Sequence, residues 1–433
     1  MVSNWQSIAF LNVLPRGRIL AAAVLAVMLA VPAGAEEGFD PEALLLTWQR
    51  DPTTTMTIDW HTPEGDTEDR MLEYRHLDAE QWRRAEPEQH PFPFTERTIH
   101  RVELTDLEPG ATYLFRIGDE GRRFRFRTVP ADTVRPIRFA AGGDTRHRQD
   151  WMERTNRQAA RYDVDFIVWG GDLAYADGRE DRLYRWDEWF AAIRNTLVTE
   201  EGRVIPVILG IGNHEVRGGY YRQHDDFEPT DAWRARIAPY YYGLFAFPGQ
   251  PGYGVLDFGD YLSIPLLDTA HTNPIEGEQT EWLAETLEAR GHVPFVFPVY
   301  HVPAYPSHRS FEGGVSRAVR EHWVPLFERY GIHFAFENHD HTYKRTHPIR
   351  EGEVDPSGIV YLGDGAWGVG TRSVHPVEET WYLAEAASAR HLILATLQGR
   401  TVRFTMIDED GNVIDEFPEA PEPIEAAPAS SAE

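Results

Sequence analysis

The sequence contains no cysteine. This absence excludes disulfide bonds, thiolate zinc sites, iron–sulfur clusters and cysteine nucleophiles. Any metal site in the chain must therefore be built from His, Asp, Glu, Asn or Tyr side chains.

Lysine is nearly absent as well. Lys344 is the only lysine among 42 basic residues, which face 69 Asp and Glu, and the formal net charge is −27. Nucleic-acid-binding surfaces need the opposite balance, because Lys and Arg make most phosphate contacts, so we expect no nucleic-acid partner. An anionic substrate would have to be held by something stronger than surface side chains. Bound metal ions are the obvious source of that positive charge.

Residues 1 to 35 are arranged as a secretory signal peptide. After two arginines, an apolar run of 13 residues (Ile19–Val31) leads to Ala33-Gly34-Ala35, which predicts cleavage after residue 35. The alternative is a membrane anchor, but spanning a bilayer takes about 20 apolar residues. We therefore expect a secreted or periplasmic protein with no stable membrane anchor after signal cleavage.

Residues 36 to 132 are predicted to form an all-β sandwich. Short runs of alternating apolar and polar residues, separated by turn residues, are typical of its strands. These runs cover residues 44–48, 56–60, 71–76, 98–104, 112–117 and 123–128. Within this region, the stretch from Leu107 to Tyr113 resembles the turn and tyrosine corner of a fibronectin type III domain, with Trp60 as its core tryptophan.

Residues 133 to 417 are predicted to form an α/β domain, because apolar runs alternate with helical segments. The predicted strands cover residues 137–141, 165–169, 204–211, 261–267, 293–300, 332–336, 391–397 and 401–408, and helices are expected at 150–162, 279–290 and 315–330. Residues 418 to 433 have the low complexity of a disordered tail.

Five of these predicted strands are followed by residues that can bind metal. They are Asp144 after 137–141, Asp172 and Tyr175 after 165–169, Asn213 after 204–211, His301 after 293–300, and His339 and His341 after 332–336. Because the carboxyl ends of strands in α/β sheets meet at one crevice, these side chains should lie close together. Taken singly, a Gly-Asp after a strand is more often a turn or helix cap. The ordered series instead predicts a metal centre.

The series is similar to that of the calcineurin-like metallophosphoesterases, whose pattern is Gly-Asp, Gly-Asp, Gly-Asn-His-Glu or Asp, His, and Gly-His-x-His. Tyr175, three residues after Asp172, is typical of the purple acid phosphatases, which also carry an N-terminal sandwich of the fibronectin type. The resemblance implies two β-sheets flanked by helices, an αββα sandwich, after the N-terminal β-sandwich. The chain departs from the pattern at Asn338, where the family has glycine. Asn is a tolerated replacement if the backbone there needs a positive φ.

The resemblance implies a centre with two metal ions. The first would be bound by Asp144, Asp172, Tyr175 and His341, and the second by Asp172, Asn213, His301 and His339, so that Asp172 bridges them. Carboxylate and phenolate oxygens suit Fe(III), whereas imidazoles, an amide and one shared carboxylate suit divalent Zn, Mn or Fe. With a bridging hydroxide, this set leaves a small net positive charge that can hold a phosphate oxyanion.

The activity implied by the resemblance is hydrolysis of a small phosphate monoester by a metal-bound hydroxide. His214, next to Asn213, is placed as the proton donor to the leaving group, with hydrogen-bonding support as its alternative role. His308 is placed near the substrate in a catalytic or binding role, or else is an ordinary loop histidine. We also hypothesise that Arg146 reaches the substrate phosphate.

Two other functions remain open from the sequence. The same two-metal site could hydrolyse a phosphodiester or a nucleotide, because fold and metals alone do not set the substrate. A non-enzymatic protein, with the β-sandwich as its working part, is the other alternative. The complete set of seven ligands together with His214 argues against the non-enzymatic reading.

Overall fold

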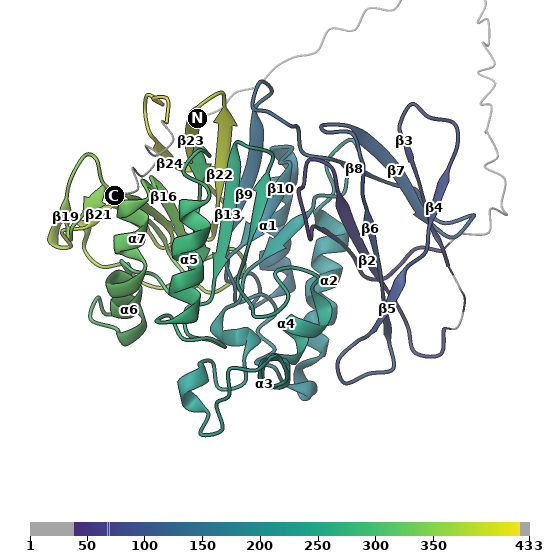
Figure 1. Cartoon of the computed structure of the whole chain (residues 1–433), viewed down its shortest axis with the longest axis horizontal. Helices are drawn as coiled ribbons and strands as arrows, with labels where there is room; N and C mark the ends of the chain where they lie inside the picture. The colour runs from purple at the N-terminus through teal and green to yellow at the C-terminus, as the bar shows by residue number, and fades with distance from the viewer. Residues whose placement is uncertain (1–38, 67, 69, 425–433) are drawn as a thin grey trace, which may run out of the picture. The chain divides into compact units, whose positions relative to one another are not determined.

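A computed structural model of the chain describes residues 39–66, 68 and 70–424 (Figure 1). The predicted signal peptide and residues 425–433 of the predicted tail lie outside the described residues. Within the described part, no helix combines the length and apolar character needed to cross a membrane.

The N-terminal region forms two antiparallel sheets of four strands each, in the orders β1-β2-β6-β5 and β4-β3-β7-β8. The strands are β1 (Leu44–Thr47), β2 (Met56–Thr62), β3 (Leu72–His76), β4 (Arg83–Ala85), β5 (Glu88–Pro91), β6 (Thr98–Leu104), β7 (Thr112–Ile117) and β8 (Phe124–Arg127). Trp60 is fully buried on β2. The hydroxyl of Tyr113 accepts a hydrogen bond from the Glu108 amide at 2.9 Å, which is the contact of a tyrosine corner. The predicted sandwich is thus present, with two polar strands, β4 and β5, that alternation did not indicate.

Two further sheets make up the rest of the fold. One has the order β11-β10-β9-β22-β23-β24, and the other β12-β13-β15-β16-β20-β17-β21 with β14 beside β13. The strands of the first are β9 (Ile137–Gly142), β10 (Phe166–Trp169), β11 (Val207–Leu209), β22 (His391–Gln398), β23 (Thr401–Asp408) and β24 (Val413–Phe417). Those of the second are β12 (Gly254–Phe258), β13 (Leu262–Leu267), β14 (Phe295–Val296), β15 (Val299–Tyr300), β16 (Phe334–Glu337), β17 (Tyr343–Thr346), β20 (Val360–Gly363) and β21 (Leu383–Ala387). The small hairpin β18 (Ile349–Arg350) and β19 (Glu353–Val354) stands apart.

Helices accompany these two sheets. They are α1 (Gln149–Arg161), α2 (Tyr184–Thr196), α3 (Asp231–Ile237), α4 (Pro239–Leu244), α5 (Glu278–Glu288), α6 (Gly314–His322) and α7 (Val324–Arg329), with short 3₁₀ turns at Glu180–Arg182, Asn213–Glu215, Tyr221–Gln223 and Val377–Glu379. Figure 1 shows α5 and α7 in front of the strands of the second sheet.

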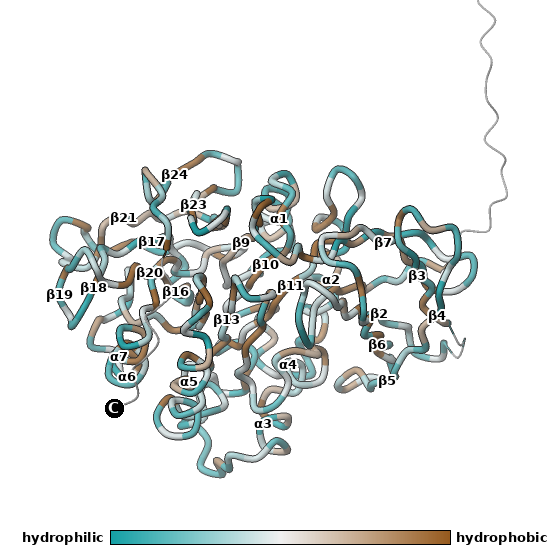
Figure 2. The backbone as a smooth tube through the Cα atoms, turned by 45° about the horizontal axis from the view of Figure 1, so that its top comes forward, coloured by the Kyte–Doolittle hydropathy of each residue, from teal (hydrophilic) through white to brown (hydrophobic). Residues whose placement is uncertain are grey.

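Successive side chains of a strand point to opposite faces of its sheet, and this divides the apolar core into two clusters. On β9, Phe139 belongs to the apolar cluster between the two sheets, where its ring centroid lies 6.0 Å from that of Phe336 on β16. Its neighbour Ala140 belongs to the cluster shared with the helices. Figure 2 shows the apolar segments along the strands and the polar ones in the outer loops. The helix–sheet–sheet–helix arrangement confirms the predicted fold class, because opposite faces of each strand are buried.

Prolines account for two boundaries that differ from expectation. The strand predicted at 293–300 is divided into β14 and β15, with Pro298 between them. The helix predicted at 315–330 ends at His322 and restarts as α7, which carries Pro325 in its first turn. Proline has no amide hydrogen to donate, so it is tolerated at a helix start but not within a strand ladder or helix interior.

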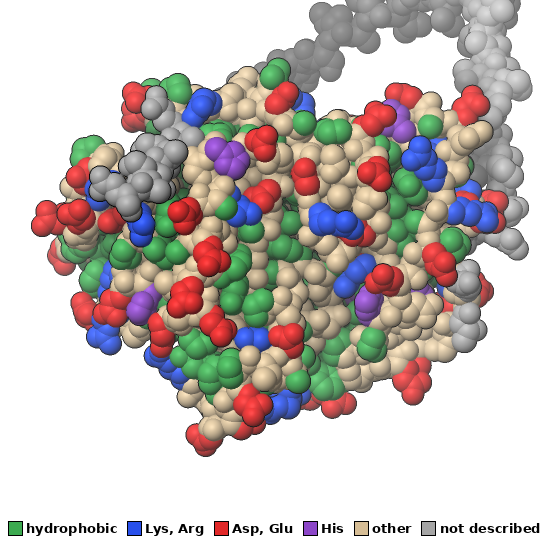
Figure 3. Space-filling view, viewed as in Figure 1, with side chains coloured by type: hydrophobic (Ala, Val, Ile, Leu, Met, Phe, Trp, Pro, Cys, Tyr) green, Lys and Arg blue, Asp and Glu red, His purple; other side chains and the backbone are tan. Residues whose placement is uncertain are grey.

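Acidic side chains are spread over the face of the molecule that Figure 3 shows, in keeping with the composition. Figure 3 shows Asp and Glu side chains distributed across the visible face, with Arg side chains interspersed among them. Many of the arginines pair with a neighbouring carboxylate, as Arg97 does with Asp187 and Arg290 with Asp257. Arginines without such a partner are therefore of interest.

Candidate metal centre

Strands from both sheets end at one place. The segments that follow β9, β10 and β11 meet those that follow β15 and β16, so two sheets, rather than the single one implied by the strand-end argument, supply the candidate ligands. Two buried groups result, Asp172 with His301 and His339, and Asp144 with Asp172 and His341. In each group one ligand atom per residue lies within 4.8 Å of the others. Asp172 belongs to both groups, as a bridging ligand must.

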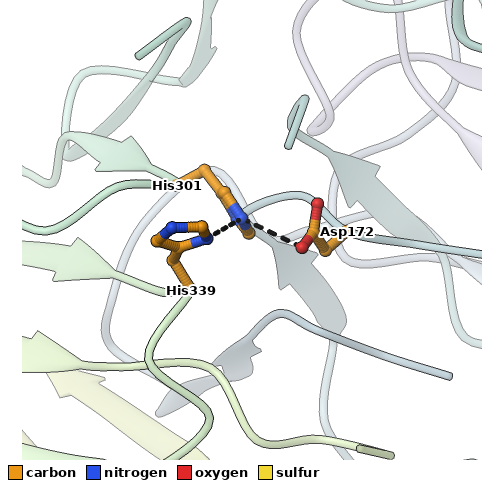
Figure 4. Close-up of side chains that lie close together, drawn as sticks. All are labelled: Asp172, His301 and His339. Atoms are coloured by element: carbon orange, nitrogen blue, oxygen red, sulfur yellow. Dashed lines mark hydrogen bonds and ion pairs between the residues drawn. The ribbon is translucent and has the colours of Figure 1, made fainter. Parts of the chain in front are cut away.

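The first group is drawn in Figure 4, where His301 lies between the other two side chains. Its Nε2 is 3.2 Å from Asp172 Oδ2 and 3.0 Å from His339 Nδ1. Its Nδ1 donates to the Gly170 carbonyl at 3.1 Å, which leaves Nε2 to face the group. Burial lowers the pKa of His301, but the carboxylates of Asp172 and Asp144 outweigh it and raise the value to about 9. The negative charge that attracts this proton would equally attract a metal cation.

The second group is completed by Tyr175. Its hydroxyl donates to Asp144 Oδ1 at 3.0 Å and lies 3.1 Å from His341 Nε2. His341 Nδ1 donates to the Gly370 carbonyl at 3.2 Å, so its Nε2 also faces the group. Burial, reinforced by Asp144, raises the pKa of Tyr175 well above its usual range. The phenol would ionise here only against a bound cation.

Asn213 adds an independent sign of a missing partner. Its side-chain oxygen is buried and accepts no hydrogen bond from the described residues. Buried polar atoms nearly always have a partner, and an amide oxygen is a suitable ligand for a hard or borderline cation. Six of the seven predicted ligands thus contact or group with one another, and Asn213 precedes His214, whose amide donates to Asp172 Oδ1. The donor types of the set fit two metal ions.

The backbone at these ligands is strained. Five of the seven have positive φ angles, namely Asp144 (55°), Asp172 (53°), Tyr175 (60°), His339 (79°) and His341 (60°). Non-glycine residues adopt this region rarely and at a cost, mostly at functional sites. Gly365 lets the backbone approach Asp144 closely, because a Cβ at this position would lie 1.9 Å from Asp144 Oδ2.

Asn338 does not have the positive φ that would favour glycine at its position. The positive φ falls on His339 instead. The Asn338 side chain fills the space beside two glycines, since a Cβ on Gly143 or Gly170 would lie 2.4 or 2.0 Å from its amide atoms. Its Nδ2 donates to the Tyr300 carbonyl at 2.9 Å, which connects the loop carrying His339 to the strand preceding His301.

Glu215 is a functional residue that sequence reasoning left without a role. Its carboxylate accepts hydrogen bonds of 2.8 Å from the amides of Asp172, Leu173 and Gly212. It thereby joins the loop of the bridging ligand to the loop of Asn213. Its position at the end of the Gly-Asn-His-Glu stretch was the available signal.

His214 lies at the edge of the metal group. Its amide donates to Asp172 Oδ1 at 2.7 Å, and its ring centroid is 4.2 Å from that of Tyr175. Its Nδ1 donates to Asp177, and its Nε2 is 4.0 Å from Asp172 Oδ2. The side chain is 35% exposed and lines a cavity of about 700 Å³ together with Asn213 and Tyr220. His214 therefore stands between the metal ligands and an open space of substrate size.

Arg146 and His308 are less directly connected to the centre. The Arg146 guanidinium pairs with Glu188 on α2 and donates to the Ala174 carbonyl at 3.5 Å. Nothing in these contacts directs it to a phosphate. The His308 amide donates to Asp340 at 2.7 Å, and its Nδ1 donates to the Ser373 carbonyl at 2.7 Å. His308 is thus adjacent to the His339–His341 loop, and a direct role for either residue stays a prediction.

Comparison with known proteins agrees with this geometry. Residues 41–128 match the model of the purple acid phosphatase N-terminal domain, and residues 131–343 match that of the calcineurin-like phosphoesterases. The chain is a purple acid phosphatase-like member of the calcineurin-like phosphoesterases. Every candidate ligand of this calcineurin-like phosphoesterase lies within the second match.

Several relatives support the assignment. Purple acid phosphatase 21 of Arabidopsis thaliana is 30% identical over 286 residues, 63% of this chain and 60% of the relative. Purple acid phosphatase 22 of the same plant is 28% identical over 275 residues, 62% of this chain and 58% of the relative. An uncharacterized protein of Mycobacterium tuberculosis is 24% identical over 394 residues, 81% of this chain and 68% of the relative. The match thus spans about three fifths of the two plant relatives.

Proposed function

We propose that this calcineurin-like phosphoesterase is a phosphatase that hydrolyses phosphate monoesters at a centre of two metal ions. The observation that carries the proposal is Asp172, a buried carboxylate shared by two groups of ligand side chains. The relatives named purple acid phosphatases support the reaction class.

The proposed ligands divide according to their chemistry. Asp144, Asp172, Tyr175 and His341 would hold Fe(III), and Asp172, Asn213, His301 and His339 would hold a divalent Zn, Mn or Fe ion. When bound, the ions acidify water and neutralise the charge of the phosphate. The backbone carbonyls of Gly170 and Gly370 accept hydrogen bonds from Nδ1 of His301 and His341, and this fixes the orientation of both rings.

His214 is proposed as the proton donor to the leaving group. Asp177 accepts a hydrogen bond from Nδ1, which sets the orientation of the ring and directs Nε2 toward the centre. Proton donation matters most when the leaving group is a poor one, because an alkoxide needs a proton to depart.

Export is the proposed location, secreted or periplasmic, on the strength of the signal-peptide pattern in residues 1–35. N-terminal sequencing of the protein recovered from the periplasm or medium tests it. A mature chain beginning at Glu36 is expected, and an intact Met1 on the membrane would contradict it.

Substrate preference is tested with p-nitrophenyl phosphate and bis-p-nitrophenyl phosphate. Phosphodiesters and nucleotides are the alternative substrates, since the cavity beside His214 has room for a second substituent. The metal-loaded protein is expected to hydrolyse the monoester with the higher kcat/KM, and Asp172→Asn should abolish activity on both. Preference for the diester would favour the alternative, and activity unchanged in Asp172→Asn would overturn the proposal.

A further inference from the structure

A second loop is attached to the metal-ligand loop through Asp340, which lies between His339 and His341 in the sequence. The Asp340 carboxylate is fully buried and accepts hydrogen bonds from the amides of His308 (2.7 Å) and Arg309 (3.0 Å). It also accepts one from Arg309 Nη1 at 2.8 Å. The loop after His301 is therefore held against the His339–His341 loop by a buried charge.

Arg309 is fixed beside a candidate ligand by these contacts. Its Nη1 also donates to the His339 carbonyl at 2.5 Å, and its side chain is 35% exposed. All its hydrogen bonds to the described residues are made by Nη1 and the backbone. Nε and Nη2 carry three further N–H donors that are free to bind an anion.

Arg372 lies on a third loop, which is fastened to the same place. Its amide donates to the His341 carbonyl at 3.1 Å, and the His375 amide donates to the Ser307 carbonyl at 2.7 Å. His308 Nδ1 adds the bond to Ser373. Within the described part of the chain, the half-buried Arg372 guanidinium makes no hydrogen bond and no ion pair.

Charges of both signs act on the Arg372 guanidinium. Burial, then the charge of Arg309, lowers the pKa of Arg372, whereas Asp144 and Tyr175 act in the opposite direction. Hydrogen bonds place both arginines beside the His339–His341 loop, because Arg309 donates to the His339 carbonyl and the Arg372 amide to the His341 carbonyl. Arg309 is paired with Asp340, whereas Arg372 has no carboxylate partner among the described residues, although the net charge of the chain is −27.

We propose that Arg309 and Arg372 form a cation pair that binds the phosphate oxygens not held by metal, and so favours doubly charged monoesters over singly charged diesters. Guanidinium groups bind phosphate oxygens through paired, charge-assisted hydrogen bonds. A phosphate monoester has one more charged oxygen than a diester. The two guanidinium groups would bind this additional oxygen most strongly. The inference rests on the proposed function, and it assigns to these residues the role first hypothesised for Arg146.

The test compares Arg372→Gln with the parent in the metal-loaded full chain. Arg372 is the first choice because its side chain supports no other residue, and Arg309→Lys is the second variant because it retains a charge near Asp340. Arg317→Gln on the exposed face of α6 is the matched control. Metal content and thermal unfolding of each variant show whether the centre and fold are intact.

For Arg372→Gln we expect KM for p-nitrophenyl phosphate to rise about tenfold with kcat within about threefold, as for loss of one hydrogen bond to a charged group. The inhibition constant of inorganic phosphate should rise in parallel, while kcat/KM for bis-p-nitrophenyl phosphate changes by less than about twofold. Equal losses on both esters, or no change in KM and phosphate inhibition, would overturn the pair.

Failure of the proposed function gives a different result. In that case the metal-loaded parent hydrolyses neither ester. Calorimetric binding of inorganic phosphate to the parent and to Arg372→Gln then tests the pair by itself. Weaker binding in the variant supports the cation pair, and equal binding contradicts it.

Discussion

Lys344, the single lysine of the chain, gives a prediction that connects stability to the site. It is completely buried, and its Nζ contacts the Glu337 carboxylate, the Tyr305 carbonyl and Asp364 Oδ1, the last at 3.1 Å. Glu337 accepts hydrogen bonds from the Tyr300 hydroxyl at 2.6 Å and the Ala304 amide at 2.7 Å. The cluster therefore joins the strand before His301 to the strand before His339.

The cost of removing this lysine follows from its surroundings. Burial opposes its charge, but Asp364 and Glu337 more than compensate and raise the pKa of Lys344. Lys344→Met keeps the volume but leaves the buried carboxyl groups of Glu337 and Asp364 without their cation, which costs about 3–5 kcal/mol of unfolding free energy. With an unfolding entropy of about 2.1 cal/mol/K per residue, roughly 0.8 kcal/mol/K for the described chain, Tm should fall by about 4–6 °C.

The assay is differential scanning calorimetry of the metal-free protein, so that metal binding adds nothing to stability. The double variant Lys344→Met with Glu337→Gln should recover about half of the loss, because one of the two carboxyl groups left without the lysine is then neutral. A single variant that loses less than about 1 kcal/mol, or a double variant no more stable than the single one, would show that the buried lysine does not stabilise the cluster in this way.

Three further predictions concern the site and the response to acid. Tyr175→Phe should abolish the visible absorption of the iron-loaded protein, because the phenolate is its source; a spectrum identical to the parent's would remove Tyr175 from the iron ligands. His214→Ala should lower kcat by about 10²–10⁴-fold on alkyl phosphates and much less on p-nitrophenyl phosphate, whose leaving group needs little protonation; equal losses on both would contradict proton donation. Burial lowers the pKa of His391 from 6.5 to about 4. Between pH 6.5 and 4 the unfolded chain therefore binds a proton that the folded chain does not, and up to about 3 kcal/mol of unfolding free energy is lost as the pH falls through this range. His391→Phe should therefore move the acid-unfolding midpoint, followed by tryptophan fluorescence, to lower pH, and an unchanged midpoint would contradict this.

The candidate ligands could be predicted from the sequence because each lies in the segment that follows a strand whose apolar pattern is readable. Asp144 and His301 illustrate this, since β9 and β15 end just before them. The division of those strands between two sheets was not readable, because β-strand pairing depends on contacts distant in sequence. Asp172 and His339 meet across that division.

The surroundings of the ligands were harder to predict. Arg309 and Arg372 lie 63 positions apart on different loops, and hydrogen bonds distant in sequence, such as those to Asp340 and Ser307, bring them together. Arg146, by contrast, lies two residues after a ligand but points to Glu188. Loop geometry is set by such tertiary contacts, and proximity in sequence does not report it.

The central claim is a centre of two metal ions that share Asp172. The most direct measurement is the metal content of the purified parent and of Asp172→Asn by elemental analysis, after removal of loosely bound ions. We expect two ions per chain in the parent, one of them iron, and the loss of both in the variant because the bridging carboxylate serves each. A parent with one ion or none, or a variant that retains both, would contradict it.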